Sequence, residues 1–213
     1  MTNPTAHPVF FSVDVETTST SPFDGELLTV GIQPVVVPAT FAAGFLWDEA
    51  EQYGPGLHVA IDCTHVYSEW FKTIHDHAST LSWWLRQNQQ AQDAAWRDTS
   101  IERLPEVTAA ERIMDFVEDV CPAFSDRVFV GNPVSFDRPW IDRLFMHAGY
   151  PIPFSHRTLC LRSMRFGATR SGGWGPERVL HDPLIPHHAL HDAQAQADDL
   201  IDILRLREHP TDS

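Results

Sequence analysis

The sequence predicts a mixed α/β or α+β fold, in which helices cover a β-sheet, and three observations support this class. Short runs rich in Val, Ile and Phe fill the first part of the chain, as buried strands do. Later stretches place apolar residues at helical spacing. Strand-like runs come first, then helical and strand-like stretches alternate, and the sequence contains no internal repeat.

The first three elements are strands that would form an antiparallel meander. Val9–Val13 is a short apolar run typical of a buried central strand. Leu27–Val37 is the second strand and Thr40–Trp47 the third, and Asp24-Gly25 predicts the turn between the first two. Residues 48–107 then form a poorly defined inserted segment, in which the sequence signals are weak.

Four helices and one further strand follow along the chain. Each helix is marked by a capping residue, by a proline or by apolar residues on one face. In chain order, we expect a helix capped by Ser79 or Thr80, a helix opened by the capping box Thr108–Glu111, the strand Arg127–Gly131, a helix capped by Ser135, and a last helix over Ala189–Arg207.

Composition indicates a single domain over residues 1–213, because 43% of the residues are hydrophobic. The net charge of −14 argues against a protein that coats nucleic acid through bulk charge, although a metal-binding acidic cluster also adds negative charge. No stretch reaches the roughly 18 apolar residues of a membrane span, and the start lacks a signal peptide. We therefore expect a cytoplasmic protein without a membrane partner. Three cysteines without a CxxC motif predict neither disulfides nor a thiolate zinc site.

The first chemical motif is Asp14-Val15-Glu16, at the end of the first strand. Residues two apart on a strand point to the same face, so the two carboxylates would repel each other when ionised. A shared Mg²⁺ or Mn²⁺ removes this repulsion, because hard cations prefer carboxylate oxygen. Alternatively, the strand ends here and both acids are exposed to solvent without a metal ion. Thr17 and Thr18 follow, and could offer hydroxyls or amides to a substrate.

The second motif joins the strand Arg127–Gly131 to the helix after it. Asn132 and Pro133 break the strand, which leaves Asp137 in the first turn of the helix. An acid there is also stabilised by the helix dipole, by about 0.3 to 1 kcal/mol, without any metal. Position favours a ligand, since the tip of a strand beside the first one would aim Asp137 at Asp14 and Glu16.

The third motif precedes and opens the last helix. His187 lies before the regular helix, and Asp192 lies in its first turn or two. A histidine beside a metal-bound water can accept its proton near neutral pH. Alternatively, His187 and His191 would form a zinc pair four residues apart, although the glutamate of an HExxH motif is missing. Otherwise His188 and His191 are expected at the surface.

Together, Asp-x-Glu, Asn-x-x-x-Phe-Asp and His-x-Ala-x-x-Asp-Ala resemble the three motifs of the DEDDh exonuclease superfamily. The resemblance covers Asp14 to Asp192 in the same order and context. It implies that Asp14, Glu16, Asp137 and Asp192 hold the metal ions and that His187 is the general base. The implied fold is ribonuclease H-like, with a five-stranded mixed sheet flanked by helices.

The same resemblance implies a 3′-5′ exonuclease that releases nucleoside 5′-monophosphates. Its cofactors would be two divalent cations, Mg²⁺ or Mn²⁺, roughly 3.5 to 4 Å apart. The expected substrate is the 3′ end of single-stranded DNA or RNA, since a terminal phosphodiester must enter a narrow pocket with its base unstacked. Many related stand-alone enzymes are dimers, which leaves a homodimer open.

Within the superfamily, Trp83-Trp84-Leu85-Arg86-Gln87 resembles a segment of exonuclease VIII-type proteins related to phage exonuclease A. One tryptophan would pack in the core while the other stacks on a base. Basic residues gather between Arg157 and Arg178 and could follow the phosphates. The expected substrate contacts are Thr17, Thr18, Asn132, Phe136, Trp84, Arg162 and Arg165.

Three other functions fit parts of these patterns. A ribonuclease H-like endonuclease would use the same fold and cut within a duplex. A non-catalytic nucleic-acid or protein adaptor would have no need for clustered, mutually repelling acids. A histidine-zinc protein would use the histidines around Asp192 instead of the carboxylates.

Overall fold

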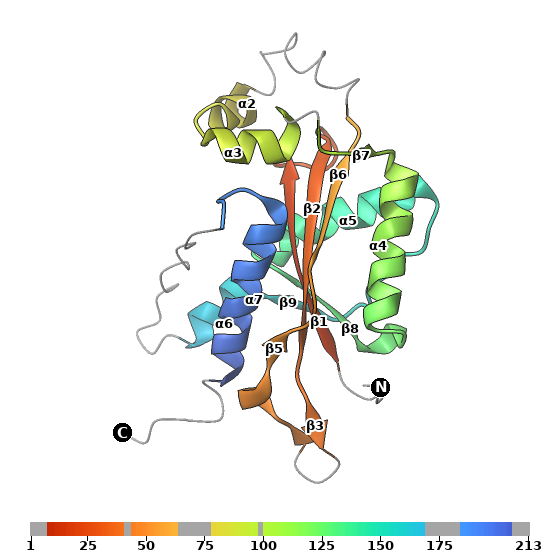
Figure 1. Ribbon diagram of the computed structural model, residues 1–213, viewed down its shortest axis with the longest axis vertical. Helices are drawn as coiled ribbons and strands as arrows, with labels where there is room; N and C mark the ends of the chain where they lie inside the picture. The colour runs from red at the N-terminus through yellow and green to blue at the C-terminus, as the bar shows by residue number, and fades with distance from the viewer. Residues whose placement is uncertain (1–7, 41–43, 64–77, 98–99, 169–183, 206–213) are drawn as a thin grey trace.

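A mixed β-sheet forms the centre of the computed structural model, which describes residues 8–40, 44–63, 78–97, 100–168 and 184–205 (Figure 1). Within these residues the strand order is β7-β6-β2-β1-β8-β9, and β5 pairs with β2. The strands are β1 (Val9–Thr17), β2 (Leu27–Val36), β5 (Glu51–Gln52), β6 (Leu57–Ile61), β7 (Arg103–Leu104), β8 (Arg127–Gly131) and β9 (Thr158–Cys160).

The pairing of β1 determines where the sheet opens. β1 runs antiparallel to β2 along its whole length, from Val9 opposite Val36 to Thr17 opposite Leu27. It runs parallel to β8 only from Val9 to Ser12. Beyond Ser12 the β8 side of β1 has no strand partner among the described residues, because the chain leaves β8 at Gly131. The last residues of β1 therefore border an open edge.

Helices cover both faces of the sheet (Figure 1). Alternate residues of β1 separate two apolar clusters: Val13 packs with helices α4 and α5, and Phe10 packs with helix α7. Because side chains alternate along a strand, Asp14 and Glu16 lie on the same face as Phe10, the face that α7 covers. The helices are α2 (Ala78–Trp84), α3 (Gln89–Gln92), α4 (Glu106–Val120), α5 (Val134–Ala148), α6 (Leu161–Ala168) and α7 (Ala189–Arg205).

The sheet confirms the expected fold class and corrects one strand. Five strands, β6-β2-β1-β8-β9, form the mixed sheet, and the two-residue strands β7 and β5 extend it. The third strand of the meander is β6, whereas the expected strand Thr40–Trp47 was wrong. That stretch instead turns back on itself as a hairpin of β3 (Ala39–Thr40) and β4 (Gly44–Phe45), with the 3₁₀ turn η1 (Trp47–Glu49) after it.

Three helices begin earlier than their capping residues predicted. α2 starts at Ala78, so Ser79 and Thr80 lie inside it. α4 starts at Glu106 with Pro105 at the N-cap, so Thr108 lies inside its first turn. α5 likewise starts at Val134 after Pro133. Both prolines occupy the N-cap position in an extended conformation, and neither has a backbone N–H that would need an acceptor there. Ile113 and Val117 of α4 are buried, and Phe116 and Val120 pack against the same core.

The segment 48–107 contributes more regular structure than the sequence indicated. Its described part adds β5, β6 and β7 to the sheet and carries α2 and α3, followed by the π-helical turn Asp93–Arg97. Leu85 follows the end of α2 and is 55% exposed. Among the described residues, no helix is both long and apolar enough to cross a membrane.

Candidate active site

The site begins with the two carboxylates at the end of β1. Asp14 and Glu16 face α7, where the strand has lost its β8 neighbour. Burial raises the pKa of both side chains well above the ordinary value, and the mutual repulsion of the nearby acids adds to the effect. The fold therefore forces together carboxylates that would ionise more easily apart.

Asp137 borders the same pocket as Asp14 and Glu16, although it comes from α5, which packs against the other face of the sheet. It lies in the first turn of α5, and its Oδ2 accepts a hydrogen bond of 3.0 Å from the backbone N–H of Asn132. Burial raises its pKa to about 7, while this hydrogen bond and the guanidinium of Arg162 act in the opposite direction. A Cβ at Gly131 would lie 2.7 Å from Oδ2 of Asp137, so a side chain there would displace the carboxylate.

The start of α7 and the residues just before it supply the fourth acid and a histidine. The backbone of His187 has a φ of 61°, in the left-handed region, and its N–H donates a hydrogen bond of 2.8 Å to Oδ2 of Asp192. Burial raises the pKa of Asp192 to about 6 and lowers the pKa of His187. The His187 imidazole is thus neutral, and able to accept a proton, at neutral pH.

Close packing seats this end of α7 against the sheet. A Cβ built on Gly31 of β2 would lie 2.1 Å from the carbonyl carbon of Ala189, the first residue of α7. Only glycine leaves room for the helix backbone at this point. Gly31 therefore sets how near His187 and Asp192 come to the acids of β1.

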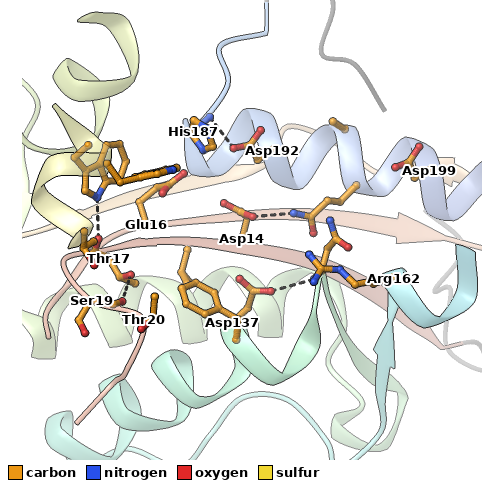
Figure 2. Close-up of a pocket in the computed structure, with 18 of the residues that line it drawn as sticks. Asp14, Glu16, Thr17, Ser19, Thr20, Asp137, Arg162, His187, Asp192 and Asp199 are labelled. Carbon is orange, nitrogen blue, oxygen red and sulfur yellow. Dashed lines mark hydrogen bonds between the residues drawn. The ribbon is translucent and has the colours of Figure 1, made fainter. Parts of the chain in front are cut away.

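The acids and the histidine form a group that can hold metal ions. Ligand atoms of Glu16, His187 and Asp192 all lie within 4.8 Å of one another. Figure 2 shows Asp14 beside this group and Asp137 on the far side of Asp14. Buried oxygen ligands that repel each other when ionised are the donor set that suits Mg²⁺ or Mn²⁺. The arrangement joins all five residues that the three motifs singled out.

Two tryptophans and His187 form an aromatic wall at one end of the site. Trp84 is 1% exposed, and its Nε1 donates a hydrogen bond of 2.9 Å to the carbonyl oxygen of Thr17. Trp83 is 36% exposed, and its ring meets that of His187 edge-on at 4.7 Å. Trp84 thus anchors α2 to the end of β1, and Trp83 presents an open aromatic face.

At the other end, α6 and α7 contribute charged and polar groups. Arg165 forms an ion pair with Asp199 and donates a hydrogen bond of 3.3 Å to Oδ1 of Asn132. Arg162 lies beside it, on the opposite side of Asp14 from His187 (Figure 2). Of the other basic residues in the tract, Arg157 lies outside the pocket, while Arg170 and Arg178 lie outside the described residues.

These two ends enclose a pocket of about 570 Å³, within the usual range for small-molecule sites. Six of the seven expected substrate contacts line it. Thr18 does not, because it is buried and its Oγ1 accepts a hydrogen bond of 2.8 Å from the N–H of Glu26. The lining contacts that the sequence indicated are Thr17, Asn132, Phe136, Trp84, Arg162 and Arg165.

Residues 9–204 of the chain match the family described as the 3′-5′ exoribonuclease Rv2179c-like domain. The chain belongs to this family. The match supports the resemblance to the DEDDh exonuclease superfamily that the three motifs indicated. No curated protein sequence matches the chain.

Solved structures of E. coli exonuclease I share the fold of this exoribonuclease-like domain. The zinc-bound complex of exonuclease I with single-stranded DNA is 14% identical, with a TM-score of 0.55, over 97% of this chain and 42% of that chain. The complex with a dA16 oligonucleotide is 15% identical, with a TM-score of 0.55, over 96% and 42%. The domain therefore has a ribonuclease H-like fold, and it spans about two fifths of the exonuclease I chains.

Several pocket residues of the exoribonuclease-like domain escaped the sequence analysis. The sequence did not distinguish which of Trp83 and Trp84 is buried, and the residues after β1 carried no strong signal for a site. Gln196 lies four residues after Asp192, one helical turn along α7, and this spacing could have revealed it. The lining residues missed were Ser19, Thr20, Thr80, Trp83, Ala195, Gln196 and Asp199.

The remaining histidines near Asp192 form a stack instead of a surface patch. His188 and His191 lie face to face with ring centroids 4.0 Å apart, and His58 of β6 lies 4.5 Å from His188. All three are partly buried, so the expectation of surface positions was wrong. The Nδ1 of His191 accepts a hydrogen bond of 2.8 Å from the N–H of Ile185. This bond engages one ring nitrogen and weakens the case for a zinc pair with His187.

Proposed function

We propose that this protein shortens single strands from the 3′ end by hydrolysing the terminal phosphodiester bond with the help of two divalent cations, Mg²⁺ or Mn²⁺. One observation carries the proposal: four acids and one histidine, from three separate elements, border a single pocket. Asp14, Glu16, Asp137 and Asp192 would hold the cations. Bound there, the cations would lower the pKa of water and stabilise negative charge on the leaving oxygen.

His187 would act as the general base. Its lowered pKa keeps the imidazole neutral at neutral pH, and the positive φ of its backbone lets the side chain lie beside Glu16 and Asp192. The hydrogen bond from its own N–H to Asp192 ties the base to a ligand carboxylate. The residue that accepts the proton of water is thereby held at a fixed distance from the acids.

The two ends of the pocket would bind different parts of the substrate. Trp83 offers an exposed ring on which a base can stack, so we assign to Trp83 the aromatic contact first expected of the buried Trp84. Arg162 would contact phosphate, because it lies in the pocket beside the acids and carries a permanent positive charge. Products would be nucleoside 5′-monophosphates.

RNA is the substrate that the family description favours, since the matched domain is called an exoribonuclease. Single-stranded DNA is the ligand of the exonuclease I structures that share the fold. We propose RNA 3′ ends as the main substrate and treat DNA as the comparison. A homodimer remains a prediction, as do the resemblance to exonuclease VIII-type proteins, a single domain over residues 1–213 and a cytoplasmic location.

The test uses matched RNA and DNA single strands labelled at either end, with Mn²⁺ or Mg²⁺ and with the Asp14→Asn variant as control. The 5′-labelled strand should shorten one nucleotide at a time, and the 3′ label should appear first as a mononucleotide. Asp14→Asn should leave both strands intact. Internal cuts with intact ends would instead support an endonuclease, and uncut strands would support an adaptor.

A further inference from the structure

Gln196 occupies an unusual position for an amide side chain. It projects from the second turn of α7 into the pocket and is only 7% exposed. Its Nε2 donates a hydrogen bond of 2.7 Å to Oδ1 of Asp14. Its Oε1 is buried and has no hydrogen-bond partner within the part of the chain that the structure describes.

The orientation of this amide follows from its neighbour. The ionised carboxylate that would bind a cation only accepts hydrogen bonds, so the NH₂ group of Gln196 faces Asp14 in that form. The carbonyl oxygen then points away from Asp14 but stays among buried groups. A buried acceptor without a donor costs free energy, and such a group in a native structure calls for a ligand or a bound water.

Packing alone does not account for a glutamine here. One turn further along α7, Leu200 fills the buried face of the helix with an apolar side chain. Gln196 is instead bordered by Asp14 and by the pocket, where the acids favour a cation. Metal sites commonly use such an outer residue to orient a ligand and to bind a water on the metal.

We propose that Gln196 is a positioning residue for the metal site: Nε2 fixes Asp14, and Oε1 accepts a hydrogen bond from a water bound to the cation. This inference rests on the proposed metal site and extends it by one residue that none of the three motifs contains. The hydrogen bond to Oδ1 leaves Oδ2 of Asp14 available for coordination. It also stabilises the ionised form of Asp14, the form that binds cations.

The test measures Mn²⁺ binding to the full chain by calorimetry, without substrate. Gln196→Met removes both polar atoms and keeps the size of the side chain. It should bind Mn²⁺ about 10- to 100-fold more weakly, the usual effect of losing an outer residue of a metal site. Gln194→Met is the matched control, since Gln194 lies on the same helix outside the pocket, and it should bind like the wild type.

Two further measurements separate positioning from folding. The melting temperature in EDTA should be similar for both variants, because the role of Gln196 requires the metal. If Gln196→Met does not fold, Gln196→Asn replaces it: its amide is one methylene too short to reach Asp14, and it should show the same weakened binding. Wild-type affinity for Mn²⁺ in the folded variant would overturn the inference.

The outcome can be read independently of the nuclease assay. If the wild-type protein shortens strands but Gln196→Met binds Mn²⁺ normally, the proposed function stands and the role of Gln196 is wrong. If Mn²⁺ binding depends on Gln196 but no strand is shortened, the positioning role stands and the proposed activity is wrong.

Discussion

The two ends of the pocket are built by different interactions. At the aromatic end, Trp84 is buried and hydrogen-bonded to the end of β1, and Trp83 and His187 meet edge-on beside it. At the charged end, Arg165 and Asp199 pair across α6 and α7. Packing fixes the first end, whereas charge and hydrogen bonding fix the second.

This difference suggests a division of labour across the acids in the centre. The aromatic end has little charge and holds the proposed base next to a surface suited to a nucleobase. The charged end carries Arg162, whose guanidinium suits a phosphate, and Gln196, which is hydrogen-bonded to the proposed metal ligand Asp14. Substitutions at the aromatic end and among the acids should therefore have different consequences for turnover, substrate binding and stability.

Removing the base should have the largest effect. His187→Ala should lower kcat by about 10² to 10⁴, as the loss of a general base does, because no other neutral imidazole borders the acids in the described pocket. Mn²⁺ affinity in calorimetry should change far less than kcat. Unchanged single-turnover rates for this variant would mean that His187 is not the base.

Displacing α7 should rank next. Gly31→Ala places a Cβ where the backbone of Ala189 lies, so the start of α7, with Asp192 and the preceding His187, must shift. A misplacement of about 1 Å can cost on the order of 10²-fold in rate. Gly167→Ala is the control, since a Cβ there meets nothing within 4 Å. Equal turnover by the two variants would show that the close packing of α7 against Gly31 is not needed for activity.

Removing the exposed ring should weaken substrate binding more than chemistry. Trp83→Ala should raise KM by a factor that corresponds to about 1 to 3 kcal/mol, the usual contribution of base stacking, with a smaller change in kcat. Leu85→Ala removes a comparably exposed side chain outside the pocket and should have no effect. A fall in kcat with unchanged KM would contradict a stacking role and favour a role in orienting His187.

The smallest effect concerns stability without metal. The pKa of Asp137 is raised to about 7 and that of Asp192 to about 6, so the folded protein holds protons that the unfolded chain has released. Raised carboxyl pKa values give stability at low pH that is lost as pH rises through the folded-state value. Thermal unfolding in EDTA should therefore occur at lower temperature at pH 8.5 than at pH 7.

A variant isolates the acids from the other titrating groups. Burial lowers the pKa values of His58 and His188 to about 4, so these two rings are neutral in the folded protein, and above pH 7 they are mostly neutral in the unfolded chain as well, where the value is about 6.5. Glu16→Gln removes one of the repelling charges, so its melting temperature should fall less between pH 7 and 8.5 than that of the wild type. An equal fall in both proteins would contradict the electrostatic explanation.

The local sequence was sufficient for the parts of the site that lie within single elements. Alternation along β1 predicts that Asp14 and Glu16 share a face, and the proline and glycine signals locate Asp137 and Asp192 near the starts of helices. The helix starts were off by a few residues because prolines, not Thr108 or Ser135, begin α4 and α5. These features depend on neighbours in the chain.

Features that depend on distant contacts could not be predicted. Whether Trp83 or Trp84 is buried depends on the hydrogen bond to Thr17, 67 positions away. The partnership of Gln196 with Asp14 spans 182 positions, and the histidine stack needs His58 from a segment with weak signals. No local periodicity encodes such pairs, since each arises only when strand and helix pack together.

Anomalous diffraction from crystals grown with Mn²⁺ tests the central claim most directly. If the acids of β1, α5 and α7 form one metal site, the strongest anomalous peaks will lie among Asp14, Glu16 and Asp192, with Gln196 still hydrogen-bonded to Asp14. Peaks at the stacked rings of His58, His188 and His191, with none among the carboxylates, would contradict the claim and with it the proposed chemistry.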